Sequence, residues 1–317
     1  MTCRKCEHGT AKRFGFTKAR SPRYRCRACG ATFTEAKQNP LGDHTTSVAD
    51  ACRVFTLLTE GMSVRAVSRV TGIHKTTILS LLNTVGEKCA RLFDAKVQNV
   101  KPRFVQADEI WTFVQKKQKR LTMKDNPAER GDQYVWIALD SETKAVLSYY
   151  IGKRDAVSAY EFIGDLSRRI AEQHRPQLTT DGLEGYIPAV EEHFGADVDF
   201  AQLVKQYAQP RTDGPDWFRP SSHVTAAIPT PIMGNPKMER ISTSHIERAN
   251  LSVRMHLRRF TRLTNGFSKK LENLKAAVAV FMAWYNFCRV HQTLRVTPAM
   301  EAGITDHVWT IGELLSA

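Results

Sequence analysis

The pattern of apolar residues changes abruptly at Lys101-Pro102, and this change constrains the fold more than any other feature of the sequence. Residues 47–97 carry apolar side chains at three- and four-residue spacing, which is typical of helices. The runs FVQADEIWTFV, YVWIALD and AVLSYYIG follow, and their apolar residues alternate or are continuous. They predict three successive strands in an antiparallel meander.

Helices and strands alternate after the meander. SAYEFIGDLSRRIAEQ and GYIPAVEEHFG predict helices, while QLTTDG and VDFAQLV predict short strands. Residues 209–240 are rich in Pro, Gly, Ser and Asp, which predicts a loop or insertion. Two helical stretches close the chain, roughly 244–263 and 270–289. The expected fold class is α/β, with a mixed sheet flanked by helices.

Four cysteines near the start form two CxxC pairs, Cys3 with Cys6 and Cys26 with Cys29. Each pair presents two thiolates from a tight turn, so residues 1–40 are predicted to form a zinc ribbon with a tetrahedral site. The alternatives are chance cysteines or redox pairs. The basic residues near these cysteines are Arg4, Lys5, Lys12, Arg13, Lys18, Arg23, Arg25 and Arg27. They indicate that the ribbon contacts phosphate, and a protein-docking role is the alternative.

Residues 63–82, SVRAVSRVTGIHKTTILSLL, have the pattern of a helix-turn-helix. Ser63 suits a helix N-cap, and Gly72 permits the turn. The expected shared core consists of Val67, Ile73 and Ile78. The residues at the start of the second helix, which would enter a DNA major groove, are His74, Lys75, Thr76 and Thr77. An ordinary helical hairpin is the alternative.

Three acidic residues are candidates for a site that binds Mg²⁺ or Mn²⁺. Asp108 lies in a predicted strand, Asp181 ends another, and Glu247 begins a helix that Thr243 or Ser244 could cap. Because side chains alternate along a strand, at most one of Asp108 and Glu109 is expected in the site. Three carboxylates can hold two divalent ions for phosphodiester chemistry. For each acid alone, a solvated strand end or helix terminus is the alternative.

The helix that contains Glu247 has a polar side and an apolar side. The expected DNA-binding residues beside and beyond the acid are Arg248, Asn250, Arg254 and Arg258, and the expected core face consists of Ile246, Val253, Leu257 and Phe260. A carboxylate at the head of a basic stripe suits a metal-dependent nuclease. A basic solvated helix is the alternative. Asp140, which ends YVWIALD, is an alternative member of the acidic triad.

The chain is strongly basic, with a formal net charge of +14 and a pI near 9.6. This charge favours a polyanionic partner, for which we expect nucleic acid, although a merely soluble basic protein is the alternative. The start MTCRKCEHGT has no apolar signal core, and the longest apolar run, 276–284, is too short to span a bilayer. A cytoplasmic, nucleoid-associated location without a membrane partner is expected.

Taken in order, these motifs resemble the insertion-sequence-one family of bacterial DDE transposases. The motifs are the cysteine ribbon, the helix-turn-helix, ADEIW at 107–111, TDG at 180–182, HIERAN at 245–250, and WYNF, HQ and TPA near the carboxyl end. The resemblance implies a ribonuclease H-like catalytic domain over 101–265, in which Asp108, Asp181 and Glu247 bind Mg²⁺. A helix-turn-helix domain over 41–100 would precede it, and a helical extension over 266–317 would follow. Arg254 matches a basic position that such enzymes often direct at the DNA end.

The resemblance also implies a DNA transposase. The amino-terminal modules would recognise terminal inverted repeats, metal-activated water would hydrolyse the phosphodiester at each element end, and the freed 3′-OH would attack target DNA. Because two ends must be joined, a homodimer or higher synaptic oligomer on double-stranded DNA is expected. The alternatives are a DNA-binding regulator with an inactive catalytic domain and a metal-dependent nuclease that does not carry out strand transfer.

Overall fold

The computed structural model describes residues 2–3, 5–17, 20–34, 40–208, 224–261 and 264–317. The chain divides into two compact units, Met1–Thr45 and Thr46–Ala317. The predictions for Arg4, Lys18 and the first part of the 209–240 loop lie outside the described residues.

The first unit is a small antiparallel sheet of strands β1 (Ala11–Phe16), β2 (Pro22–Cys26) and β3 (Thr32–Thr34). Among the described residues of the range 2–34, only Cys3 and Cys26 are buried. A unit with so little apolar core needs a cross-link to hold its fold.

The second unit begins with three helices, α1 (Val48–Thr59), α2 (Val64–Thr71) and α3 (Lys75–Lys96). Ser63 caps α2 by accepting a hydrogen bond from the Ala66 amide at 3.1 Å, and Gly72 ends it with a positive φ of 75°. The helices share a core of Val54, Val67 and Ile78, against which Ile73 packs. The predicted caps, turn and core residues are therefore confirmed as local structure.

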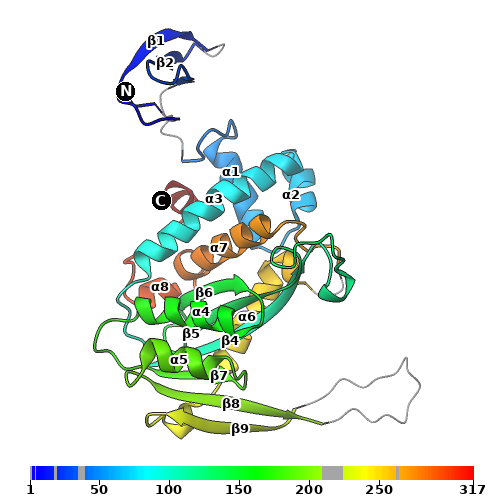
Figure 1. Cartoon of the computed structure of the whole chain (residues 1–317), viewed down its shortest axis with the longest axis vertical. Helices are drawn as coiled ribbons and strands as arrows, with labels where there is room; N and C mark the ends of the chain where they lie inside the picture. Colours follow the sequence, from blue (N-terminus) through cyan, green and yellow to red (C-terminus); the bar gives the residue numbers. More distant parts are fainter. Residues whose placement is uncertain (1, 4, 18–19, 35–39, 209–223, 262–263) are drawn as a thin grey trace, which may run out of the picture. The chain divides into compact units, whose positions relative to one another are not determined.

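A six-stranded mixed sheet follows, with the order β6-β5-β4-β7-β8-β9 (Figure 1). The predicted meander is confirmed as β4 (Phe104–Val114), β5 (Gly131–Asp140) and β6 (Val146–Gly152), which pair antiparallel. Strand β7 (Gln177–Asp181) pairs in parallel with β4 and with β8 (Asp199–Tyr207). This mixed sheet flanked by helices is compatible with a ribonuclease H-like fold.

Strand β9 (Val224–Met233) pairs antiparallel with β8, so the predicted loop over 209–240 is wrong for this stretch. Pro229 and Pro231 suggested a loop because proline cannot donate to a ladder. They are tolerated because β9 is the edge strand of the sheet, where a missing N–H group can face away from the neighbouring strand.

Helices cover the sheet on both faces. On one face, Trp136 of β5 packs against Phe162 of α4 (Ala156–Arg169) and Tyr186 of α5 (Tyr186–Phe194). On the other, α6 (Ser244–His256) lies against β4 and β5. It ends earlier than predicted, and Arg258–Phe260 form the separate 3-10 turn η3.

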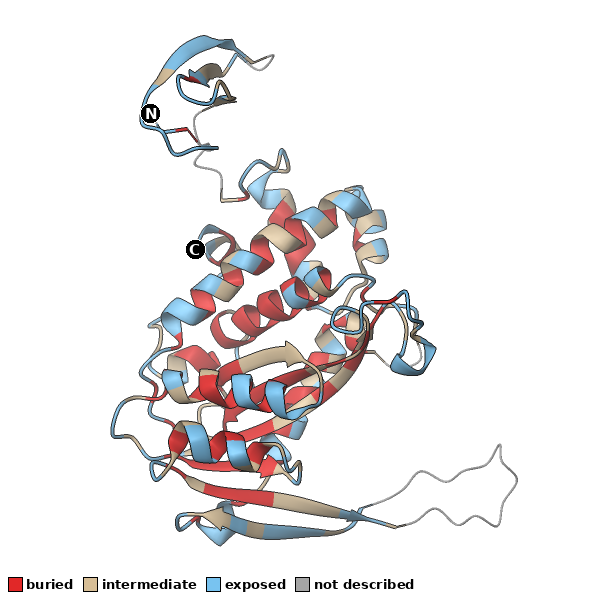
Figure 2. Cartoon of the chain, in the orientation of Figure 1, coloured by how far each residue is buried: buried red, intermediate tan, exposed pale blue. Residues whose placement is uncertain are grey.

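Helix α7 (Leu271–Phe287) is buried along nearly its whole length and packs against α3 (Figure 2). Two short helices, α8 (Pro298–Glu301) and α9 (Ile311–Ser316), complete the chain, and single 3-10 turns lie at η1 (Gln118–Arg120) and η2 (Met238–Arg240). Within the described ranges, no helix has both the length and the apolar character needed to cross a membrane.

Candidate metal centres

The pairing of β4 with β7 brings Asp108 and Asp181 together. The parallel register matches Phe104 with Gln177 and ends at the pair of Gln106 with Thr179, and Asp108 and Asp181 each lie two residues beyond this last pair. Asp181 is the last residue of β7, and its Oδ1 accepts a hydrogen bond from the Leu183 amide at 3.0 Å. Two of the three predicted acids therefore meet where these strands separate.

Glu109 is the third member of this acidic group. One carboxylate oxygen from each of Asp108, Glu109 and Asp181 lies within 4.8 Å of the others, close enough to share a metal ion. The expectation that at most one of Asp108 and Glu109 enters the site is therefore wrong. The two side chains do start on opposite faces, with Asp108 hydrogen-bonded to Asn250 of α6 and Glu109 near Tyr186 of α5. Because Asp181 is the last residue of β7, its carboxylate can approach side chains on both faces of β4.

The crowding of these carboxylates shifts their protonation. Burial, followed by the neighbouring charge of Asp181, raises the pKa of Asp108 to about 6. The same two causes raise the pKa of Glu109 to about 7. The Glu109 side chain is 2% exposed, and its Oε1 is buried without a hydrogen-bond partner in the described part of the chain. An arrangement of this kind suits a divalent cation, which would supply the missing positive charge and ligand contact.

Arg154, between β6 and α4, is the cation that now contacts this group. Its Nε lies 3.1 Å from Glu109 Oε2 and its Nη2 lies 3.1 Å from Asp181 Oδ2. Arg154 lies in the loop KRD, which carries no motif, so its role could not be predicted from the sequence. The guanidinium neutralises two of the carboxylates that a metal ion would use.

Helix α6 is fixed to β4 by a side chain rather than by the predicted cap. Thr243 and Ser244 make no capping hydrogen bond to the helix amides. Instead, the buried Gln106 Oε1 accepts hydrogen bonds from the amides of His245 at 2.9 Å and Ile246 at 3.1 Å. This contact satisfies two helix donors and sets the start of α6 against the strand that carries Asp108.

Glu247 lies outside the 4.8 Å group but close to it in the fold. Asn250, one helical turn further along α6, donates to Asp108 Oδ2 at 2.8 Å. Glu247 itself forms an ion pair with Lys205 of β8 and accepts a hydrogen bond from Thr243 Oγ1 at 2.7 Å. Burial opposes ionisation of Glu247, but these two donors outweigh it and lower the pKa of the carboxyl.

Two other predicted site residues have local structural roles. Asn250, predicted to bind DNA, is buried, and its one described hydrogen bond goes to Asp108. Asp140, the alternative triad member, closes the turn after β5 by accepting hydrogen bonds from the Glu142 amide at 3.0 Å and Thr143 Oγ1 at 2.7 Å. It lies outside the metal-binding groups found among the described residues.

The predicted basic stripe is interrupted. Because α6 ends at His256, Arg258 lies in η3 and not on the same helix as Glu247. Arg254 Nη1 donates to the Phe260 carbonyl at 3.3 Å, which ties the helix end to this turn. Arg248 stays exposed on α6.

The residues at the start of α3 are placed as predicted. His74 is the N-cap, and its Nδ1 accepts from the Thr76 amide at 3.4 Å. Lys75 is exposed next to it, and Thr77 is half-buried.

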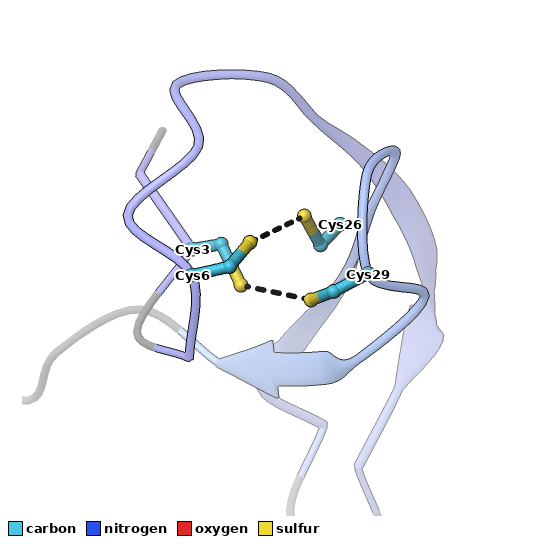
Figure 3. A group of neighbouring side chains, drawn as sticks. All are labelled: Cys3, Cys6, Cys26 and Cys29. Atoms are coloured by element: carbon cyan, nitrogen blue, oxygen red, sulfur yellow. Dashed lines mark hydrogen bonds between the residues drawn. The ribbon is translucent and has the colours of Figure 1, made fainter.

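The four cysteines of the ribbon converge in the first unit (Figure 3). The Sγ atoms of Cys3 and Cys29 are 3.6 Å apart, as are those of Cys6 and Cys26. These separations are too long for disulfides and match the edge of a tetrahedron with metal–sulfur bonds of about 2.3 Å. Hydrogen bonds from backbone amides lower the pKa of Cys3 and lower that of Cys26 to about 6, whereas the neighbouring thiols and burial raise the pKa of Cys6 to about 12. The group could hold a divalent metal.

No protein-family model and no curated protein matches this chain. Among solved structures, the Mos1 strand transfer complex has 15% sequence identity and a TM-score of 0.22, and the match covers 49% of this chain and 57% of that chain. The Mos1 mariner paired end complex with Mn has 15% identity and a TM-score of 0.20, with coverage of 47% and 58%. The chain thus matches less than two thirds of the length of these relatives. TM-scores this low do not establish a common fold.

Proposed function

We propose that this chain is a metal-dependent DNA transposase of the DDE type, similar to the insertion-sequence-one family. The observation that carries the proposal is the acidic group of Asp108, Glu109 and Asp181, with Glu247 held nearby by the contact between Asn250 and Asp108. The enzyme binds the terminal inverted repeats of its element, cleaves the phosphodiester at each end and joins the 3′-OH to target DNA.

The proposed ligands of Mg²⁺ or Mn²⁺ are Asp108, Asp181 and Glu247. Glu109 lies beside Asp108 and Asp181 and adds negative charge. Divalent ions bound there would activate an attacking hydroxyl and stabilise the leaving oxygen of the phosphodiester. Glu109 contributes charge from the opposite face of β4. Arg154 and Lys205 neutralise these acids in this structure, and with a metal bound to the acids they would be free to contact phosphate oxygens.

The amino-terminal modules are proposed to hold the DNA ends. The four cysteines Cys3, Cys6, Cys26 and Cys29 would bind Zn²⁺, whose preference for tetrahedral thiolate sites fits their spacing. Helices α2 and α3 would act as a helix-turn-helix, with His74, Lys75, Thr76 and Thr77 at the DNA. Arg248, Arg254 and Arg258 would contact phosphates nearer the acidic group. Two chains, one for each end, would form the synaptic complex.

The test is a cleavage and joining assay on labelled DNA that carries the element ends, with nicked and joined products scored separately. Asp108→Asn and Glu247→Gln should each retain DNA binding but lose both products by more than about 100-fold, because an amide cannot replace a charged metal ligand. Glu161→Gln, which removes an exposed acid on α4, is the matched control and should keep full activity.

The outcomes separate the alternatives. Binding by the folded, zinc-loaded wild type without Mg²⁺-dependent cleavage would favour a regulator. Cleavage without joined products would favour a nuclease. Full cleavage by Glu247→Gln would remove Glu247 from the site.

A further inference from the structure

A cavity of about 500 Å³ lies in the second unit between helices α1–α3, the segment after α6, and α7. Apolar side chains, including Leu58, Met62, Leu82, Phe267 and Phe281, form much of its wall. Five basic residues also line it, namely Arg65, Lys75, Arg258, Arg259 and Lys269. The described residues around the cavity include no aspartate or glutamate. Such a lining suits a ligand with one anionic part and one apolar part.

Arg259 is the most unusual of these cations. Burial of its side chain lowers its pKa to about 10. Its Nη1 donates to Ser268 Oγ at 2.8 Å, and it forms no ion pair with any described carboxylate. Arg259 is half-buried, and a cation that is partly withdrawn from water without a counter-ion favours the binding of an anion at this position.

The cavity is connected to the acidic group through α6. At the carboxyl end of this helix, His256 Nδ1 lies 2.7 Å from the Thr59 carbonyl of α1. A Cβ atom on Gly61 would lie only 2.5 Å from the Met255 carbonyl, so the two backbones touch. The residue of α6 that contacts Asp108 is Asn250, six residues before His256, so the acidic group and the cavity are separated by about 10 Å along the helix.

We propose that this cavity binds one nucleotide of a DNA strand, with the phosphate against Arg259 and the surrounding cations and the sugar and base over the apolar wall. The inference rests on the proposed function only in taking DNA as the source of the phosphate. At about 3.4 Å per nucleotide, about 10 Å corresponds to roughly three nucleotides. The bound nucleotide would therefore lie about three positions from the bond cleaved at the acidic group.

The experiment measures binding of the full-length, zinc-loaded protein to a fluorescein-labelled duplex of the element end, without Mg²⁺, over a series of salt concentrations. Arg65→Gln, Lys269→Gln and Arg259→Gln should each weaken binding about 3- to 10-fold. Each should also reduce the slope of log K against log[salt] by about one, because one phosphate contact is lost. Lys101→Gln removes an exposed charge outside the cavity and should change neither quantity.

Arg259 also holds Ser268, so the exposed positions Arg65 and Lys269 provide the test if Arg259→Gln does not fold. Wild-type affinity and slope in both folded surface variants would overturn the proposal. So would saturable binding of dAMP or inorganic phosphate in the cavity that leaves DNA binding unaltered, since this would assign a small-molecule site. The binding assay contains no Mg²⁺, so its result does not depend on cleavage. If the cavity variants reduce the salt slope as expected but the wild-type protein cleaves no DNA in the separate cleavage assay, only the proposed transposase activity is contradicted.

Discussion

Several carboxylates of the acidic group lower the stability of the folded, metal-free chain. Glu109 and Asp108 have raised pKa values because burial and the charge of Asp181 disfavour their ionised forms. Arg154 offsets part of this cost by contacting Glu109 and Asp181. Metal-free protein therefore holds a charged group that is stabilised mainly by one partly exposed guanidinium, and a divalent ion would stabilise it further.

This arrangement predicts how stability depends on pH. The pKa of Glu109 is about 7 when folded and about 4.5 when unfolded, so the folded chain binds more protons between these values. Metal-free stability should fall as pH rises from about 4.5 to about 7, and by pH 8 the full cost should be present. Glu109→Gln should therefore stabilise the metal-free protein at pH 8 by roughly 1–3 kcal/mol.

Urea unfolding followed by tryptophan fluorescence measures this effect, because all five tryptophans lie beyond Thr45. The variant should gain less from added Mg²⁺ than the wild type. Glu161→Gln is the control and should leave both values unchanged. A loss of stability in Glu109→Gln at pH 8 would show that the ion pair with Arg154 outweighs the cost of burial.

Sequence patterns identified only part of this group. Asp108 and Asp181 could be predicted because each belongs to a strand with a recognisable motif. Glu109 was rejected on strand alternation, which holds for the faces of β4 but not for an acid at the end of β7. Arg154 and Lys205 could not be predicted, since they meet the acids only through the register of distant strands.

At the scale of elements, α6 links the sheet to the amino-terminal helices. Gln106 holds its first turn against β4, and His256 holds its last turn against α1. Its length could not be predicted, because the apolar spacing of Leu257 and Phe260 continues the helical pattern into η3. Similarly, β9 could not be predicted, because Pro229 and Pro231 are typical of a loop. The helices and strands with uninterrupted periodicity lie within a few residues of their predicted positions, and the largest difference is that the helix predicted over 158–173 ends at Arg169.

The cysteine ribbon is an element whose fold should depend on metal. Cys26→Ser should lose zinc and unfold residues 2–34, because Cys26 and Cys3 are the buried residues of that stretch among those described. The second unit has its own core, so its tryptophan unfolding transition should be unchanged. Atomic emission for zinc and circular dichroism on the purified variant test this, with Cys52→Ser as the control. Unchanged zinc content would contradict the assignment.

At the scale of the whole second unit, each edge of the large sheet is blocked at particular residues. On the β6 edge, the buried Asn286 side chain of α7 accepts from the Val146 amide at 2.9 Å and donates to its carbonyl at 2.8 Å, as a neighbouring strand would. On the β9 edge, Pro229 and Pro231 are two residues apart and both remain within the ladder to β8. Their missing N–H groups therefore face outward.

Asn286→Leu should destabilise the second unit by about 2–4 kcal/mol, because a buried backbone amide and carbonyl lose their partner. Asn273→Leu, on the same helix, is the matched control. Its side chain is also buried, but its Oδ1 has no partner in the described part of the chain, so its replacement should cost less. Urea unfolding of the two variants provides the comparison, and equal losses would show that Asn286 acts through packing alone.

The closed edges also determine how copies of this chain can come together. Exposed strand edges recruit other strands, and crowded molecules with open edges tend to aggregate. On the proposed DNA partner, a net charge of +14 would bring many copies close together. With the sheet blocked at Val146 on one edge and at Pro229 and Pro231 on the other, strand pairing between neighbouring copies is disfavoured at these positions.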